Sequence, residues 1–247
     1  MTRIAIVTPY YKEPKTELER CLASVARQSL SADHILIADG HPQTWLEALP
    51  LRHLALDRNH ANFGNTPRAV GALLAIGEGY DAVGFLDADN WLEPDHLEHC
   101  LEAAEESGAP QEIDYVLAKR TLRRPDGQAL AISADAAYFK ADTNCLLFFP
   151  GAYHLLPIWG TMPAEVAPIG DRMLYRAIQA AKLRVAETQR ETVNYVTDYA
   201  GAYLMAGESP PADAKGIDFE GIVRWMNGLG RREREIAERC SGAPFTK

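Results

Sequence analysis

The stretch Ala82-Val83-Gly84-Phe85-Leu86-Asp87-Ala88-Asp89-Asn90-Trp91 decides how the rest of the chain is interpreted. An apolar run ends at Leu86, and two carboxylates follow it at once. Open α/β sheets bind ligands beyond the carboxyl ends of their parallel strands, so a buried strand ending here would present Asp87 and Asp89 to a ligand. Such oxygen ligands suit Mg²⁺ or Mn²⁺, which commonly keeps water and phosphate oxygens in its other positions. The same residues also form ordinary turns through side-chain to backbone hydrogen bonds, which is the competing interpretation.

Working outward, strand and helix patterns alternate around this stretch. Pro94 suits a first helical turn, and an apolar stripe at helical spacing follows it over residues 97–104. This order, with polar connections after the strands, predicts a parallel sheet through about residue 105 and a nucleotide-binding half over residues 1–105. Before the stretch, strand patterns lie at 4–7, 34–38 and 51–56, and helical patterns at 18–26 and 70–74.

The second half, residues 106–247, changes character and is expected to face the acceptor. A smaller antiparallel element is predicted here, beginning with a hairpin that turns at residues 124–127. We find no internal repeat and no domain linker, which predicts a single α/β domain over 1–247 with a mainly parallel sheet flanked by helices. A strand is expected at 143–149, followed by a substrate-facing loop from Pro150 to Gly170 and a helix beginning near Asp171. Short strands are expected at 184–187 and 192–196. A final amphipathic helix, with Phe219, Ile222, Val223 and Met226 on its apolar side, is expected to end in the charged run 231–235.

Composition narrows the class of protein. The chain has 247 residues, 47% of them hydrophobic, and a formal net charge of -9, which argues against nucleic acid or an anionic membrane as the main partner. A small phosphate-bearing ligand remains compatible with this charge because a bound cation can offset it. The four cysteines are far apart, which disfavours a zinc site or disulfides. A strand pattern begins directly after Met1-Thr2-Arg3, and no apolar run is long enough to span a bilayer, so we expect a cytoplasmic protein.

Several motifs, taken together, resemble a known family. The segments Val7-Thr8-Pro9-Tyr10-Tyr11, Ser24-Val25-Ala26-Arg27-Gln28-Ser29 and Ile35-Leu36-Ile37-Ala38-Asp39-Gly40 look like the opening of family 2 glycosyltransferases, which have the GT-A fold. The resemblance continues in consistent order through residues 62–69, 87–89 and 170–174, but the last third of the chain does not carry it. It implies an inverting transferase that moves a sugar from a nucleoside diphosphate donor to an acceptor, usually with Mn²⁺ or Mg²⁺.

The resemblance also implies a donor-binding set. Asp39 matches the second acid of the family's Asp-Asp-Gly-Ser element, although Ala38 replaces the first acid and His41 replaces the serine. Arg68 matches the arginine of an Ala-Arg-Asn stretch, whose asparagine is absent here. Structural alternatives are a packed loop for Tyr11, an Asx turn for Asp39 and a surface cation for Arg68. The implied donor-binding residues are Pro9, Tyr11, Asp39, Arg68, Asp87 and Ala88, and the implied metal ligands are Asp89 and Asp87.

Asp171 is the candidate catalytic base. Inverting transfer needs a group that takes the proton of the acceptor hydroxyl, and a carboxylate at a loop–helix junction can be aimed at that point. The family has an acidic pair here, of which only the second member is present, after Gly170. The alternative is a helix N-cap, and Glu165 is the next acid to consider if Asp171 is not the base.

Other residues are less specific. His96 and His99, with Asp95, have the helical spacing of metal ligands but are expected on the solvated side of a helix. His154 is a possible neighbour of the metal or the acceptor. Trp159 resembles an acceptor-side aromatic that would stack on a sugar, and its alternative role is a hydrophobic anchor.

The sequence therefore predicts an inverting, metal-dependent glycosyltransferase, with a UDP-sugar favoured as donor and a carbohydrate or other hydroxyl compound as acceptor. A sugar-phosphate nucleotidyltransferase is one alternative, but the bulky segment 10–14 lacks the glycine-rich phosphate loop that it would need. A nucleotide-sugar-binding module without transfer activity is another, supported by the missing acid before Asp171. Any membrane contact would be peripheral and made through the acceptor.

Overall fold

A central mixed sheet organises the molecule. The computed structural model describes residues 2–108, 112–132 and 142–245, and within them eight strands form one sheet in the order β3-β2-β1-β4-β7-β6-β8-β5. The strands are β1 (Ile4–Tyr10), β2 (Asp33–Ala38), β3 (Arg52–Ala55), β4 (Ala82–Phe85), β5 (Trp91–Leu92), β6 (Tyr115–Arg123), β7 (Leu146–Phe148) and β8 (Val185–Val196).

The predicted fold class is confirmed. Strand β1 lies between β2 and β4 and is parallel to both, and β3 extends the parallel part. Strand β7 then runs antiparallel to β4 and to β6, while β8 is parallel to β6 and antiparallel to β5. Because β1, β2 and β4 are parallel, their carboxyl ends meet at one edge of the sheet, where Asp39 and Asp87 follow β2 and β4.

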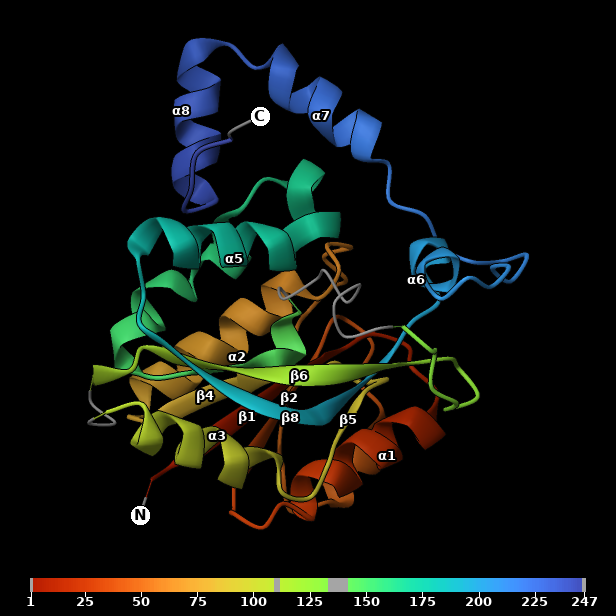
Figure 1. Cartoon of the computed structure of the whole chain (residues 1–247), viewed down its shortest axis with the longest axis vertical. Coiled ribbons are helices and arrows are strands. Elements are labelled where there is room, and N and C mark those ends of the chain that lie inside the picture. The colour runs from red at the N-terminus through yellow and green to blue at the C-terminus, as the bar shows by residue number, and fades with distance from the viewer. Residues whose placement is uncertain (1, 109–111, 133–141, 246–247) are drawn as a thin grey trace.

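Helices cover both faces of the sheet. Figure 1 shows α2 and α5 over one face and α1 and α3 over the other. Helix α2 approaches β1 closely, since a Cβ atom added at Gly71 would lie 2.4 Å from Val7 Cγ1. The helices are α1 (Lys15–Ala26), α2 (Asn65–Gly77), α3 (His96–Glu106), α4 (Ile158–Thr161), α5 (Gly170–Ala181), α6 (Ala200–Met205), α7 (Phe219–Gly228) and α8 (Arg231–Cys240).

The expected apolar stripe of α2 needs correction. The helical pattern expected at 70–74 rests on large apolar residues, yet Leu73 is 50% exposed, because Gly71 and the buried alanines Ala69, Ala72 and Ala75 line the side that contacts the sheet. Small residues allow the helix and sheet to approach, and a helical pattern based on large apolar residues misses that side.

The second half also differs in detail from the prediction. The hairpin turn is present, with Gly127 N–H donating to Arg124 O (2.8 Å), but its returning strand is reduced to one bridge between Arg123 and Ala129. The strand expected at 143–149 begins with a 3-10 turn, and the two short strands expected at 184–196 are one strand, β8, because β6 pairs along most of its length.

The segment from Pro150 to Gly170 is helical rather than a loop, and its prolines account for this. Instead of a loop it forms short helical turns, and Pro150, Pro157 and Pro163 stand at their beginnings. Proline is tolerated there because the first turn of a helix leaves its N–H groups unpaired in any case.

The C-terminal part forms two helices where one was expected. The charged run 231–235 forms the first turns of α8, because the helical conformation is interrupted at Leu229 and Gly230. The N–H of Gly230 donates a hydrogen bond to the Glu233 carboxylate. Figure 1 shows α7 and α8 far from the sheet, beyond α5. A cluster that includes Met173 of α5, Ile222 of α7 and Ala237 of α8 holds them there. None of the helices in the described ranges has the length and apolar character that a bilayer-spanning segment needs.

Candidate active site

A cavity of about 820 Å³ opens at the carboxyl ends of β1, β2 and β4. Residues from the first 105 positions form one side, and residues 142–143, 167–172 and 195–219 contribute to the other. The structure therefore brings all eight predicted site residues to one cavity: Pro9, Tyr11, Asp39, Arg68, Asp87, Ala88, Asp89 and Asp171.

Asp87 is held firmly from two sides. Its backbone N–H donates to Asn144 Oδ1 (2.6 Å), and its Oδ2 accepts a hydrogen bond from Asn144 Nδ2 (3.1 Å). Its Oδ1 forms an ion pair with the guanidinium of Arg68. Asn144 also donates to Asp142 Oδ1 (2.7 Å), so one buried amide connects two acids of the cavity. The orientation of the Asp87 carboxylate is therefore set by the protein.

Asp89 is different. Its backbone carbonyl accepts a hydrogen bond from Arg20 (2.6 Å), but its carboxylate forms no ion pair within the described residues. Burial and, after it, the negative charges of Asp87 and Glu13 together raise the pKa of the Asp89 carboxyl to about 8. A carboxylate that is costly to ionise for these reasons would be stabilised by a nearby cation.

The two carboxylates are a partial metal site. No group of three or more His, Cys, Asp or Glu side chains is arranged to hold a metal ion in the part of the chain that the structure describes. Mg²⁺ is commonly bound through one or two carboxylates, with substrate phosphates and water completing its coordination. Asp87 and Asp89 fit that pattern, because a ligand in the cavity could supply the other oxygens.

Asp171 lies in the first turn of α5. The N-cap position of α5 is Ile169, which has no side-chain cap, so the alternative role of Asp171 as N-cap is wrong. Its Oδ1 instead accepts a hydrogen bond from Arg172 N–H (2.7 Å). Burial, followed by the negative charge of Asp142, raises the pKa of the Asp171 carboxyl to about 6. A carboxylate with a pKa just below neutrality is suited to accept a proton near pH 7.

The missing acid before Asp171 has a steric reason. A Cβ atom at Gly170 would lie 3.0 Å from both Asn65 Nδ2 and Trp159 Cζ3. An acidic side chain in this position would need these neighbours to move.

Asp39 is buried, and its carboxylate is hydrogen-bonded within the protein. It is 4% exposed, and its carboxylate accepts hydrogen bonds from the backbone N–H of His60 (3.1 Å) and the His60 ring (2.7 Å). The Asp39 carboxylate is bonded to residue 60 and not, in the part of the chain that the structure describes, to the N–H of residue 41, so the Asx-turn alternative is wrong. Gly40 is required beside it, since φ is +79° and a Cβ atom would lie 2.3 Å from Asn59 N.

Arg68 and Tyr11 both line the cavity. Arg68 is 8% exposed, donates to Phe63 O (2.7 Å) and stacks over Trp159, so the surface-cation alternative is wrong. Its Nε and the Trp159 Nε1 are buried without a partner among the described residues. The Tyr11 ring meets His41 edge-on at 4.6 Å, so this tyrosine packs its loop and also lines the cavity.

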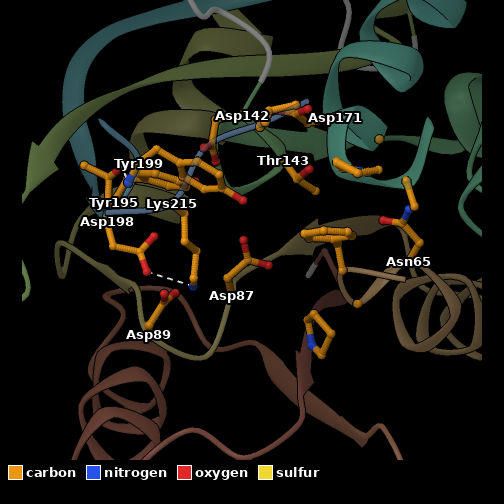
Figure 2. A pocket seen from close by; sticks show the side chains of 18 of the residues that line it. Asn65, Asp87, Asp89, Asp142, Thr143, Asp171, Tyr195, Asp198, Tyr199 and Lys215 are labelled. Carbon is orange, nitrogen blue, oxygen red and sulfur yellow. Dashed lines mark hydrogen bonds and ion pairs between the residues drawn. The ribbon is translucent and has the colours of Figure 1, made fainter. Parts of the chain in front are cut away.

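Several further charged residues of the cavity were not predicted from the sequence. Asp142 is buried, with Arg120 Nη1 3.9 Å from its carboxylate, and Figure 2 shows it beside Asp171. Glu13 accepts a hydrogen bond from Tyr11 N–H (2.6 Å), and burial raises its pKa. Lys215, on the segment between α6 and α7, forms an ion pair with Asp198. These residues come from segments without a motif, so only their positions in the fold reveal them.

The less specific predictions have mixed outcomes. His96 was expected to be solvated but is 4% exposed and bonded to Thr192 Oγ1 (2.7 Å), because β8 covers that side of α3. His99 lies between Asp95 and Glu102, outside the cavity. His154 is exposed, donates to Gly151 O and also lies outside it.

Trp159 lines the cavity, whereas Glu165 does not. Trp159 is 1% exposed and packs edge-on against Phe85, as expected of a hydrophobic anchor, and it contributes to the cavity wall. Glu165 is exposed and lies outside the cavity, which makes it a poor substitute for Asp171 as base.

Comparison with known proteins gives a family and a fold. Residues 5–156 match the family model described as glycosyl transferase family 2. No curated protein matches the chain.

Solved structures of TarS from S. aureus have a similar fold. TarS 1–349 in complex with UDP has a TM-score of 0.60 and 14% identity, over 97% of this chain and 70% of TarS 1–349. TarS 1–349 in complex with UDP-GlcNAc gives a TM-score of 0.59 and 14% identity, over 97% and 71% of the two chains. A longer TarS structure gives a TM-score of 0.57 and 15% identity, over 94% of this chain and 45% of that one. At such identities the likeness establishes the shared fold.

Proposed function

This chain belongs to glycosyl transferase family 2, and from that premise we propose that it is an inverting, metal-dependent enzyme that transfers a sugar from a UDP-sugar to an acceptor hydroxyl. Family membership disfavours the nucleotidyltransferase alternative. The observation that carries the finer proposal is that Asp87, Asp89 and the half-buried Asp171 line one cavity.

The donor would occupy the part of the cavity next to the parallel strands. Pro9 and Tyr11 would flank the base, Asp39 would accept hydrogen bonds from base or ribose, and Arg68, Asp87 and Ala88 would contact the rest of the nucleotide. UDP is favoured because TarS, which has a similar fold, has been solved with UDP and with UDP-GlcNAc. The engagement of Asp39 by His60 leaves it fewer free lone pairs for the base than an unpaired carboxylate would have.

Asp89 and Asp87 would hold Mn²⁺ or Mg²⁺, which would neutralise the negative charge that develops on the departing diphosphate. The chain prepares these ligands in different ways. Arg68 and Asn144 orient Asp87, whereas the Asp89 carboxylate is half-buried among like charges. A cation would relieve that repulsion.

Asp171 would act on the acceptor. As the acceptor oxygen forms its bond to the anomeric carbon, the bond from that carbon to the diphosphate oxygen breaks and its electron pair leaves with the diphosphate. The proton of the acceptor hydroxyl passes to Asp171. Attack from the side opposite the leaving group inverts the anomeric configuration. We also propose that 1–247 works as one domain, with 1–105 as the donor half and 106–247 as the acceptor half, since both contribute to the cavity.

One experiment tests the proposal. The protein is incubated with UDP-sugars, Mn²⁺ and a panel of carbohydrate acceptors, and release of UDP and formation of glycoside are measured. Binding of UDP is measured in parallel by calorimetry, with GDP, CDP and ADP as comparison ligands. Acceptor-dependent release of UDP with an inverted product would support the proposal.

A silent binding module is the second candidate, because Gly170 stands where the family has the acid that precedes the base, and a side chain there would require Asn65 and Trp159 to move. Binding of UDP without hydrolysis or transfer across the whole panel would favour the module. Failure to bind UDP, together with tight binding of another nucleoside diphosphate, would overturn the choice of donor.

A further inference from the structure

The cavity is rich in acidic residues, and its basic residues differ in their partners and in how far they are buried. Among the residues that the structure describes, seven acids line it, namely Glu13, Asp39, Asp87, Asp89, Asp142, Asp171 and Asp198. In the same described part of the chain, four bases share the lining: Arg68, Arg120, Arg172 and Lys215. Arg68 and Arg120 are buried against Asp87 and Asp142, and Arg172 lies over the Phe219 ring. The Lys215 side chain, by contrast, is 65% exposed at the cavity.

The backbone of Lys215 is fixed to the cavity wall. Its N–H donates to Asp198 O (2.8 Å), and its carbonyl accepts a hydrogen bond from Ala200 N–H (2.9 Å). A bridge between Tyr199 and Lys215 aligns the two segments in parallel. Residues 198–215 lie outside the part of the chain that matches the family model. Lys215 is therefore a feature of the C-terminal third, held in place by the fold.

The side chain of Lys215 lies between Asp198, its ion-pair partner, and Asp89. Its Nζ lies 2.7 Å from Asp198 Oδ2. Figure 2 shows the ammonium pointing toward Asp89, and the two charges interact. The hydrogen bond to Asp198 and, to a smaller extent, the charge of Asp89 raise the pKa of Lys215. An exposed cation thus lies next to the carboxylate that the proposed function assigns to the metal and the donor diphosphate.

We infer that Lys215 is a donor-binding residue whose ammonium rests on Asp198 in the free protein and moves to the diphosphate when the donor binds. The inference rests on the proposed function. The resting ion pair is easily exchanged, because exposed pairs such as this contribute little to stability. The lysine stem is flexible, and its ammonium binds phosphate oxygens as a point charge. A divalent cation at Asp89 would repel the ammonium while the diphosphate attracts it.

The test is a Lys215→Met variant, which keeps a side chain of similar length without the charge. Lys119→Met is the matched control, because Lys119 is exposed on β6 and outside the cavity. Binding of UDP, UMP and uridine is measured by calorimetry with Mn²⁺, for parent and both variants, after circular dichroism has checked folding. Loss of a charge-assisted hydrogen bond predicts a decrease in UDP affinity of about 10- to 100-fold in Lys215→Met. UMP should lose less, and uridine and the control variant should be unchanged.

A second variant separates donor binding from a structural clamp. Asp198→Asn removes the resting partner of Lys215 and should leave UDP affinity at least as high as in the parent. If Lys215 and Asp198 merely clamp the segment, both variants should weaken UDP, UMP and uridine alike, and that result would overturn the inference.

The inference and the proposed function fail in different ways. A parent protein that binds none of UDP, GDP, CDP and ADP would overturn both. A parent that binds UDP with an affinity equal to that of Lys215→Met would overturn the role of Lys215 and leave the proposed function intact.

Discussion

Replacing Asp171 with Asn should make the protein more stable and much less active. The pKa of the Asp171 carboxyl rises from its usual 3.8 to about 6, chiefly through burial. The folded state therefore holds the proton to a higher pH than the unfolded state does. Ionisation costs the folded state nothing below about pH 4, and the full cost is present above about pH 6. This pKa difference corresponds to a loss of at most about 3 kcal/mol in the free energy of unfolding, and the partial exposure of the carboxyl reduces that loss to about 1–2 kcal/mol.

Asparagine removes this cost and keeps the local structure. The Asn Oδ1 atom can still accept the hydrogen bond from Arg172 N–H that Asp171 accepts at 2.7 Å. Urea unfolding of parent and variant at several values between pH 4 and pH 8 measures the difference. We expect equal stabilities near pH 4 and an advantage for Asp171→Asn that grows to about 1–2 kcal/mol by pH 7.

Activity should change in the opposite direction. The value of kcat/KM for the parent should rise with pH through about 6, as Asp171 loses its proton. In Asp171→Asn the rate should fall by about 10²–10⁴-fold, as is typical for loss of a general base, with little change in UDP affinity.

Glu165→Gln is the matched control, because Glu165 is a nearby exposed acid outside the cavity. It should leave transfer unchanged. Near-parental transfer by correctly folded Asp171→Asn would refute the assignment of the base, and a stability difference that does not vary with pH would refute the electrostatic reasoning.

Three further substitutions test the metal site, the support of Asp87 and the packing of α2. Asp89→Asn should weaken Mn²⁺-dependent UDP binding by at least about 10-fold. The variant should be as stable as the parent or more stable, since the folded state raises the pKa of this carboxyl to about 8. Unchanged Mn²⁺ dependence of UDP binding in calorimetry would contradict the assignment. Asn144→Leu keeps the volume but removes the bonds to Asp87, so kcat/KM should fall by roughly 10-fold or more in a transfer assay; parental kinetics would show that Asp87 needs no such support. Gly71→Ala should cost about 1–3 kcal/mol in urea unfolding because the new methyl group would collide with Val7; an unchanged midpoint would exclude that close packing.

Much of the donor side of the cavity could be predicted from local sequence. Apolar runs such as Ile4–Tyr10 and Ala82–Phe85 form buried strands, and the residues just after strands of one parallel sheet must gather at one edge. The resemblance to family 2 assigned Asp39 and Asp87 to one donor-binding set, and both residues line the cavity. The motif around Gly170 and Asp171 likewise predicted where α5 begins.

Contacts between distant segments could not be predicted in this way. His96 was expected in solvent because a periodic pattern describes only its own helix, whereas β8 covers that side of α3. Asn144 follows no recognisable motif, yet it holds Asp87 because β7 pairs with β4 and brings the preceding turn against it.

The sequence alone thus determined the class of the sheet, the order of its parallel strands along the chain and the acids at their ends, because apolar periodicity and turn residues act over a few positions. Only the tertiary structure decided what surrounds those acids. The partners of Asp87, the burial that raises the pKa of Asp171, and the approach of Lys215 to Asp89 all depend on segments separated by tens of residues. Such neighbours follow from how the whole chain packs, and no local pattern records them.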